Sequence, residues 1–256
     1  MHLHESHAYL NRLRRLHPGY KLALATTTSL CCLLLSNPWA SLVAILWMGG
    51  LTVAAAQVPL RRFLGLLMAE FFFLSLSVIG IVVSFSLAAP EQMAWVWHIG
   101  PVWISSGSEP LWQGLVVLMR ALGAASAMSF LALTTPLVDL MDVLRRLHVP
   151  EFLIDVMTVM YRFVFVLLAT LGRIATAQDA RLGYVDKRRA MHSAGLLGSQ
   201  LFVTTFRRSQ RMQTALNSRG YNNSLRVLPG EYTTSQRWVW LTVCVACSML
   251  MVSMFA

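Results

Sequence analysis

The sequence predicts an all-α integral membrane protein, with about five transmembrane helices and long amphipathic helices on the cytoplasmic side. Its 256 residues have a mean hydropathy of +0.59 and only 12% of them are charged, which is too apolar for an ordinary soluble domain. Lysine and arginine together number 21, against 11 aspartates and glutamates. Because the basic residues lie between apolar runs, they indicate membrane topology rather than nucleic-acid binding.

A membrane-spanning helix needs about 20 largely apolar residues. The runs that meet this need lie at 20–36, 39–57, 63–87, 112–134 and 238–256. A turn at residues 36–39 joins the first two runs, and Thr134-Thr135-Pro136 ends the fourth. We expect an N-terminal cytoplasmic segment at 1–19, a four-span region at 20–134 with an outer loop at about 88–111, a cytoplasmic domain at 135–237 and a last transmembrane helix at 238–256.

The positions of lysine and arginine indicate which helix ends face the cytoplasm. Residues 1–21 and the connection at 58–62 contain basic residues, whereas residues 87–112 contain no lysine or arginine. Basic residues of short loops stay predominantly inside. The N-terminus is therefore predicted to be cytoplasmic and residues 87–112 to be outside, as a non-helical or short-helical lid whose tryptophans suit the headgroup region.

Residues 136–237 hold 14 of the 21 basic residues and one apolar stretch, 152–171, that hydropathy alone would class as another span. If this stretch crossed the membrane, the arginines that follow it would lie outside, against the charge bias of the chain. Asp155 and Arg162 also interrupt the stretch, and each would cost roughly 2.5 to 3.5 kcal/mol at a bilayer centre. We therefore predict that 136–237 is cytoplasmic and built from long amphipathic helices.

Residues 198–219 form the clearest of these amphipathic patterns, with arginine on one face and apolar side chains on the other. The two faces consist of Arg207, Arg208, Arg211 and Arg219, and of Phe202, Phe206, Met212 and Leu216. A helix lying on anionic lipid would show the same pattern. Gly220 predicts where the helix ends, because glycine readily takes the positive φ of a helix cap.

Two stretches at the far ends of basic helices look alike, 177–184 (AQDARLGY) and 215–221 (ALNSRGY). The pair resembles the two Ala-Arg-Gly motifs of the transmembrane (T) components of energy-coupling factor (ECF) transporters. Ser218 stands at the alanine position of the second motif, and Leu182 separates Arg181 from Gly183 in the first. Segments 11–21, 137–150 and 161–168 are similar to the cobalt-type, or CbiQ-type, branch of these components, so the resemblance covers essentially the whole chain.

The resemblance implies a mechanical role in a bacterial inner membrane. A T component links a metal-binding membrane partner, the S component, to two ATP-binding cassette ATPase subunits, with a small accessory membrane subunit as a further candidate partner. Two arginine-tipped helices dock on the ATPases. The implied docking residues are Ala180, Arg181, Gly183, Ser218, Arg219 and Gly220, supported by a basic face of Arg207, Arg208 and Arg211. Arginine suits this task because its planar fork of donors can bridge carboxylates or carbonyls in a groove.

The resemblance implies that this chain binds no cofactor, while ATP and Mg²⁺ act in the partner subunits and Co²⁺ or Ni²⁺ is the cargo. Cobalt is the preferred cargo and nickel the nearest alternative, because the absent S component chooses the metal. The sequence has no G-x-x-x-x-G-K-[ST] phosphate loop, no H-E-x-x-H and no G-x-S-x-G, which predicts a non-catalytic subunit. No nucleic-acid partner is expected.

Two other functions compete with coupling. A stand-alone channel or carrier should place ionisable groups at mid-membrane, and Glu70 and Arg120 are the candidates, although residue counting puts them at different depths. His2, His4 and His7 could hold a transition metal, but they lie in a cytoplasmic terminal segment and are weak candidates. The four cysteines fall in apolar runs and are expected to be structural thiols.

Overall fold

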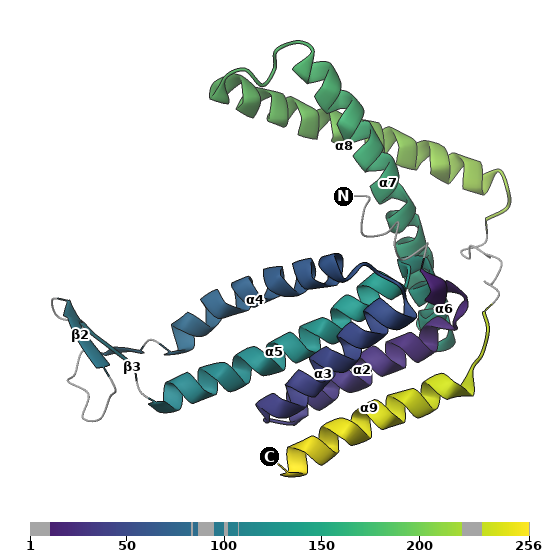
Figure 1. Ribbon diagram of the computed structural model, residues 1–256. Helices are drawn as coiled ribbons and strands as arrows, with labels where there is room; N and C mark the ends of the chain where they lie inside the picture. Colours follow the sequence, from purple (N-terminus) through teal and green to yellow (C-terminus); the bar gives the residue numbers. More distant parts are fainter. Residues whose placement is uncertain are drawn as a thin grey trace. The chain divides into compact units, whose positions relative to one another are not determined.

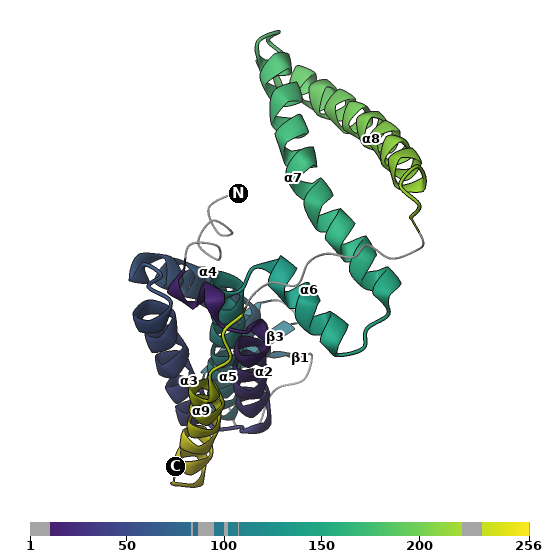
Figure 2. The same cartoon turned by 90° about the vertical axis from the view of Figure 1, so that its right-hand side faces the viewer.

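The computed structural model describes residues 11–82, 84–86, 95–99, 102–106, 108–221 and 232–255. These residues fall into two compact units, one within 1–140 and 230–256 and the other within 141–229 (Figures 1 and 2). The first unit is a bundle of apolar helices. The second unit is built on a hairpin of two long helices, and it lies inside the segment 135–237 that the sequence assigns to the cytoplasm.

The bundle contains the following helices, in chain order: α2 (Pro18–Leu34), α3 (Pro38–Gly50), α4 (Leu60–Val82), α5 (Ser108–Thr134) and α9 (Gln236–Phe255). A short 3₁₀-helix, η1 (Arg12–Arg15), precedes α2, and a π-helix, η2 (Leu51–Ala55), continues α3. Helix α6 (Leu137–Arg146) follows the bundle, and α7 (Glu151–Asp179) and α8 (Lys187–Asn217) form the hairpin. The all-helical membrane class predicted from the sequence is confirmed.

Proline and side-chain caps set where the first two bundle helices begin. Pro18 and Pro38 occupy first-turn positions, where the missing N–H costs no hydrogen bond. His17 Nδ1 accepts from the Gly19 amide at 3.0 Å, and Asn37 Oδ1 accepts from the Trp39 amide at 3.0 Å. Each contact satisfies one amide that the helix itself cannot pair. The turn expected at 36–39 is therefore a capped start of α3.

Helix α5 is the centre of the bundle: α2, α3 and α4 all pack against it, and α9 covers α2 and α3 (Figure 1). Leu24, Met48 and Phe130 are fully buried where α2, α3 and α5 meet. A side chain at Gly123 of α5 would lie 2.8 Å from Cys32 Sγ. Glycine is therefore required for this close approach, as is common where membrane helices pack.

The structure describes five helical segments long and apolar enough to cross a membrane: Pro38–Ala55, Leu60–Gly80, Pro110–Thr134, Glu151–Asp179 and Gln236–Phe255. The first predicted span, 20–36, forms α2, whose 17 residues are at the short end of the spanning range. Helix α7 qualifies by length and composition, whereas the charge distribution predicts that 152–171 is cytoplasmic. Helix α4 exposes a row of large apolar side chains, as expected for a surface in lipid.

Between α4 and α5 the chain forms a small antiparallel sheet. Its strands are β1 (Ser84–Ser86), β2 (Trp95–Ile99) and β3 (Val102–Ser106), in the order β1-β3-β2. In register, Phe85 pairs with Ile104, and Trp97 pairs with Ile104 from the other side. The predicted outer loop at 88–111 is therefore partly strand, and its bounds change because α4 ends at Val82 and α5 begins at Ser108.

The junction of α3 and η2 contains a wider backbone turn than an α-helix has. The Ala56 amide donates to the Leu51 carbonyl at 3.1 Å, five residues back, and the Thr52 hydroxyl donates to the Met48 carbonyl at 2.6 Å. Gln57, two residues after the end of η2, adopts a positive φ of 55°. The two hydrogen bonds and the left-handed residue together turn the chain from α3 toward α4.

Basic side chains cap the carboxyl ends of two bundle helices. The Lys21 ammonium is fully buried and donates to the Thr134 carbonyl at the end of α5 at 3.0 Å. Asn11 Nδ2 donates to the same carbonyl at 2.9 Å. Arg120 of α5 donates in turn to the Leu33 carbonyl at the end of α2. Terminal carbonyls have no partner within their own helix and attract positive charge, so these contacts bind α2 and α5 together at both ends.

We expect Lys21→Met to destabilise the bundle, because it removes a charge-assisted hydrogen bond to the Thr134 carbonyl, which then keeps only the Asn11 donor. The loss should be about 1–3 kcal/mol, which lowers Tm by several degrees. Thermal unfolding of the purified protein in detergent measures it. Lys187→Met, at an exposed lysine of α8, is the matched control; equal Tm values for the two variants would contradict the capping role.

Candidate functional site

The end of α7 is a tightly closed turn that carries Arg181. The Gly183 amide donates to the Gln178 carbonyl at 2.9 Å, and the Leu182 amide donates to the Asp179 carbonyl at 2.9 Å. This pair of bonds is the Schellman motif, in which the penultimate residue takes a left-handed conformation. Here that residue is Leu182, with φ of 59°.

The end of α8 has the same backbone arrangement around Arg219. The Tyr221 amide donates to the Leu216 carbonyl at 3.1 Å, and the Gly220 amide donates to the Asn217 carbonyl at 3.1 Å. Gly220 takes the left-handed conformation, with φ of 70°. In both turns the arginine immediately precedes the left-handed residue, so the two tips present Arg181 and Arg219 from the same local geometry.

This equivalence defines which residues of the two motifs correspond, although Leu182 separates Arg181 from Gly183 in the first. Leu182, and not Gly183, lies at the position equivalent to Gly220, and Gly183 corresponds to Tyr221. Leucine in this conformation costs about 1–2 kcal/mol relative to glycine. Its side chain is 63% exposed, so burial offsets little of that cost. The first motif therefore keeps the turn without its glycine.

Gly183 has a different role, which is to let the turn pack against α8. A Cβ atom there would lie 2.7 Å from Ser193 Oγ and 2.9 Å from the Gln178 carbonyl oxygen. Ser193 Oγ donates to the Gly183 carbonyl at 2.9 Å. Gln178 Nε2 donates to the Ser193 carbonyl at 3.0 Å, and the Tyr184 hydroxyl donates to Gln178 Oε1 at 2.6 Å. The first tip is thus fixed by side chains as well as by backbone.

Both tip arginines are exposed, and within the described residues neither guanidinium has a hydrogen bond or ion pair. Ala180 and Ser218, which precede them, are also exposed, and the Ser218 hydroxyl donates back to the Thr214 carbonyl at 2.9 Å. Two rigid turns therefore offer unpaired planar forks of donors to a partner.

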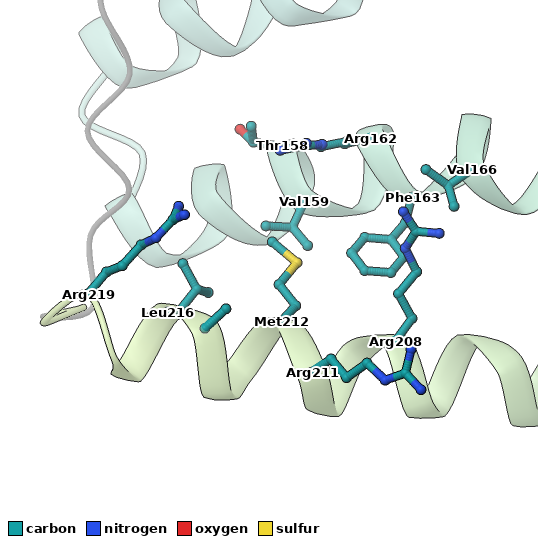
Figure 3. Close-up of a pocket in the computed structure, with 11 residues that line it drawn as sticks. Thr158, Val159, Arg162, Phe163, Val166, Arg208, Arg211, Met212, Leu216 and Arg219 are labelled. Atoms are coloured by element: carbon teal, nitrogen blue, oxygen red, sulfur yellow. The ribbon is translucent and has the colours of Figure 1, made fainter.

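Each tip arginine also borders a groove between α7 and α8, the helices that meet at residues 180–186 and separate away from that turn in Figure 2. The groove beside Arg181 measures about 410 Å³ and includes Arg173. The groove beside Arg219 measures about 560 Å³, and its basic residues are Arg162, Arg208, Arg211 and Arg219 (Figure 3). Arg207 is not among its lining residues, so the predicted basic face divides into Arg208 and Arg211, which line the groove, and Arg207, which does not.

The candidates for the competing functions do not come together in the described residues. Glu70 Oε1 accepts from the Ser129 hydroxyl at 2.6 Å, whereas Arg120 contacts the Leu33 carbonyl. No cluster of three or more potential metal ligands occurs in the described part of the chain. His2, His4 and His7 lie outside the described residues. The four cysteines carry free thiols.

Three residues that fix a helix end or the first tip have roles that no local sequence pattern indicates. Lys21 reads as one of the basic residues of the N-terminal segment, and Ser193 belongs to no motif. Gln178 lies within the first motif, but the motif does not indicate its hydrogen bonds with Ser193 and Tyr184. The separation along the chain explains this: Lys21 and Thr134 are 113 residues apart, and Gln178 and Ser193 are 15 apart.

One family and several known proteins match this chain. The CbiQ family, described as "Cobalt transport protein", matches residues 11–228. The cobalt transport protein CbiQ of Rhodobacter capsulatus is 35% identical over 131 residues, 51% of this chain and only 54% of the relative. CbiQ of Salmonella typhimurium is 28% identical over 72% of this chain and 82% of the relative. The energy-coupling factor transporter transmembrane protein EcfT of Limosilactobacillus fermentum is 27% identical over 82% of this chain and 80% of the relative.

The apolar helices define a multi-pass membrane protein. The match across residues 11–228 shows more than this class: the chain belongs to the CbiQ family of cobalt transport proteins, which confirms the resemblance stated from its sequence. Members of this family and EcfT are transmembrane components of transporters, so the predicted family and membrane class are established together.

We expect Gly183→Ala to loosen the first tip, because the new methyl group would meet both Ser193 Oγ and a backbone carbonyl. Overpacking of this kind costs about 1–3 kcal/mol. Hydrogen exchange of amides 178–193 should become faster. Gly195→Ala on α8 is the matched control, because a Cβ there meets open space; unchanged exchange in Gly183→Ala would contradict the packing role.

We also expect Leu182→Gly to raise the Tm of the purified protein, because glycine relieves the left-handed strain and the lost side chain is largely exposed. Gly220→Ala should lower Tm for the converse reason. Each change should be about 1 kcal/mol. A lower Tm for Leu182→Gly would mean that the leucine contributes contacts that outweigh its backbone strain.

Proposed function

We propose that this chain is the transmembrane coupling subunit, the T component, of an ECF importer for cobalt. The observation that carries the proposal is the pair of equivalent helix ends, each presenting an exposed and unpaired arginine before a left-handed residue. Family membership supports the transporter class, and the two tips support a mechanical role within it.

The tips have the properties of docking elements. Each arginine is held on a turn whose backbone is fixed by hydrogen bonds, so little backbone freedom remains to be lost on binding. A guanidinium offers donors in a fixed plane to carboxylates or to carbonyls at the end of a partner helix. Two tips on one hairpin match two ATPase subunits, one arginine for each. Movement of the ATPases would then move α7 and α8 as levers.

The partners follow from this division of labour. ATP and Mg²⁺ belong to the two ATPase subunits, and this chain hydrolyses nothing itself. The S component binds the metal and sits beside the helix bundle in the inner membrane, with the N-terminus of this chain and the hairpin in the cytoplasm. A small accessory membrane subunit is a further candidate. Cobalt is the proposed cargo because the CbiQ relatives are named cobalt transport proteins, and nickel is the nearest alternative.

We expect Arg181→Glu and Arg219→Glu each to reduce recovery of the ATPase subunits with this chain from native membranes. Losing a hydrogen bond to a charged partner costs about 1.5–3 kcal/mol, or at least tenfold in affinity. Affinity purification at matched membrane levels of the bait measures the recovery.

Arg146→Glu is the matched control for this experiment, because it reverses an exposed arginine of α6, which belongs to neither tip. It should retain the ATPases. Undiminished recovery with both tip variants would refute the docking role and leave the basic helices as a surface for anionic lipid.

A further inference from the structure

The groove beside Arg219 gathers positive charge that the tips do not explain. Arg162 comes from α7, and Arg208, Arg211 and Arg219 come from α8 (Figure 3). All four are exposed, and no carboxylate occurs among the described residues that line the groove. None of the four has a hydrogen bond or ion pair within the described part of the chain. Like charges held this close repel one another, so an anion bound among them would be stabilised.

The floor of the same groove is apolar. Figure 3 shows Arg208 and Arg219 rising from α8 toward α7, with Met212 and Leu216 between them. These two residues, with Val159 and Phe163, also line an adjoining recess of about 220 Å³. The recess adds the apolar side chains Phe152, Val156 and Met160. Asp155 at its edge is only 5% exposed and already has a partner.

We propose that this groove binds an anionic phospholipid, with its phosphate among the arginines and an acyl chain along the apolar recess. Arginine forks match phosphate oxygens, and a free phosphate would leave the recess empty. The recess beside the arginines is lined mainly by apolar side chains of α7 and α8, which suits the acyl chain attached to a lipid phosphate better than an acidic protein segment. The inference goes beyond the proposed function, because it needs neither ATPase nor S component.

The test is a titration of the purified full chain, in neutral detergent, with dioleoyl phosphatidylglycerol or dioleoyl phosphatidylcholine, followed by native mass spectrometry. Arg162→Gln/Arg208→Gln removes one charge from each helix. An arginine near an anionic lipid contributes about fivefold in affinity, so the double variant should bind phosphatidylglycerol about 25-fold more weakly. Phosphatidylcholine binding should stay as in the wild type.

Two further variants make the test specific. Arg207→Gln removes a neighbouring charge of α8 that does not line the groove, and should change phosphatidylglycerol binding by less than about twofold. Arg162→Lys/Arg208→Lys keeps the charge but removes the planar fork, so its binding should fall between that of the wild type and that of Arg162→Gln/Arg208→Gln. Circular dichroism of each variant confirms that helical content is unchanged.

Three results would overturn the proposal. The first is wild-type affinity for phosphatidylglycerol in Arg162→Gln/Arg208→Gln. The second is an equal loss in Arg207→Gln, which would indicate diffuse surface charge. The third is displacement of the lipid by an equal concentration of glycerol 1-phosphate, or of a glutamate-rich peptide, which would assign the groove to a free anion or to a protein segment.

Discussion

Carbonyl groups at the carboxyl end of a helix need donors, and this requirement organises both units of the molecule. Within a bilayer no water can supply them. In the bundle, Lys21 and Asn11 donate to the end of α5, and Arg120 donates to the end of α2. Because α2 and α5 each satisfy the other's terminus, the two helices hold a fixed register. Helices α3 and α4 then pack against α5, and α9 covers α2 and α3.

In the hairpin, backbone amides of the turns donate to the terminal carbonyls, so no side chain is needed there. The arginines of the hairpin ends are therefore not used as caps. At the ends of α7 and α8 the amides of the turn satisfy the terminal carbonyls. Arg181 and Arg219 are therefore free for a partner, whereas Lys21 and Arg120 are committed to structure. Basic residues near helix ends therefore have two roles in this chain. Where the turn leaves the terminal carbonyls without donors, a basic side chain binds them; where the turn supplies its own donors, the basic side chain stays exposed.

The helical membrane class and the family could be predicted from the sequence, because apolar length and the arginine motifs are local signals. The end of α8 could also be predicted, since glycine is the usual residue for the left-handed conformation that Gly220 adopts. The first tip was not: Leu182 adopts that conformation although leucine disfavours it, and the true role of Gly183 depends on Ser193 in the next helix. The capping role of Lys21 could not be predicted, because its partner, the Thr134 carbonyl, is 113 residues away in the sequence. Two sequence signals disagree for α7. Its length and apolarity predict a membrane span, whereas the arginines that follow it predict a cytoplasmic position.

The π-helical turn at Leu51–Ala55 has an evolutionary consequence. An α-helix closes each hydrogen bond over four residues, whereas here the Ala56 amide reaches back five, so the segment holds one residue more than regular winding requires. Removing that residue would restore α-helical winding and leave the rest of α3 in place. A single-residue deletion among relatives should therefore be tolerated at this junction, while the same deletion inside α5 would rotate buried residues out of the core.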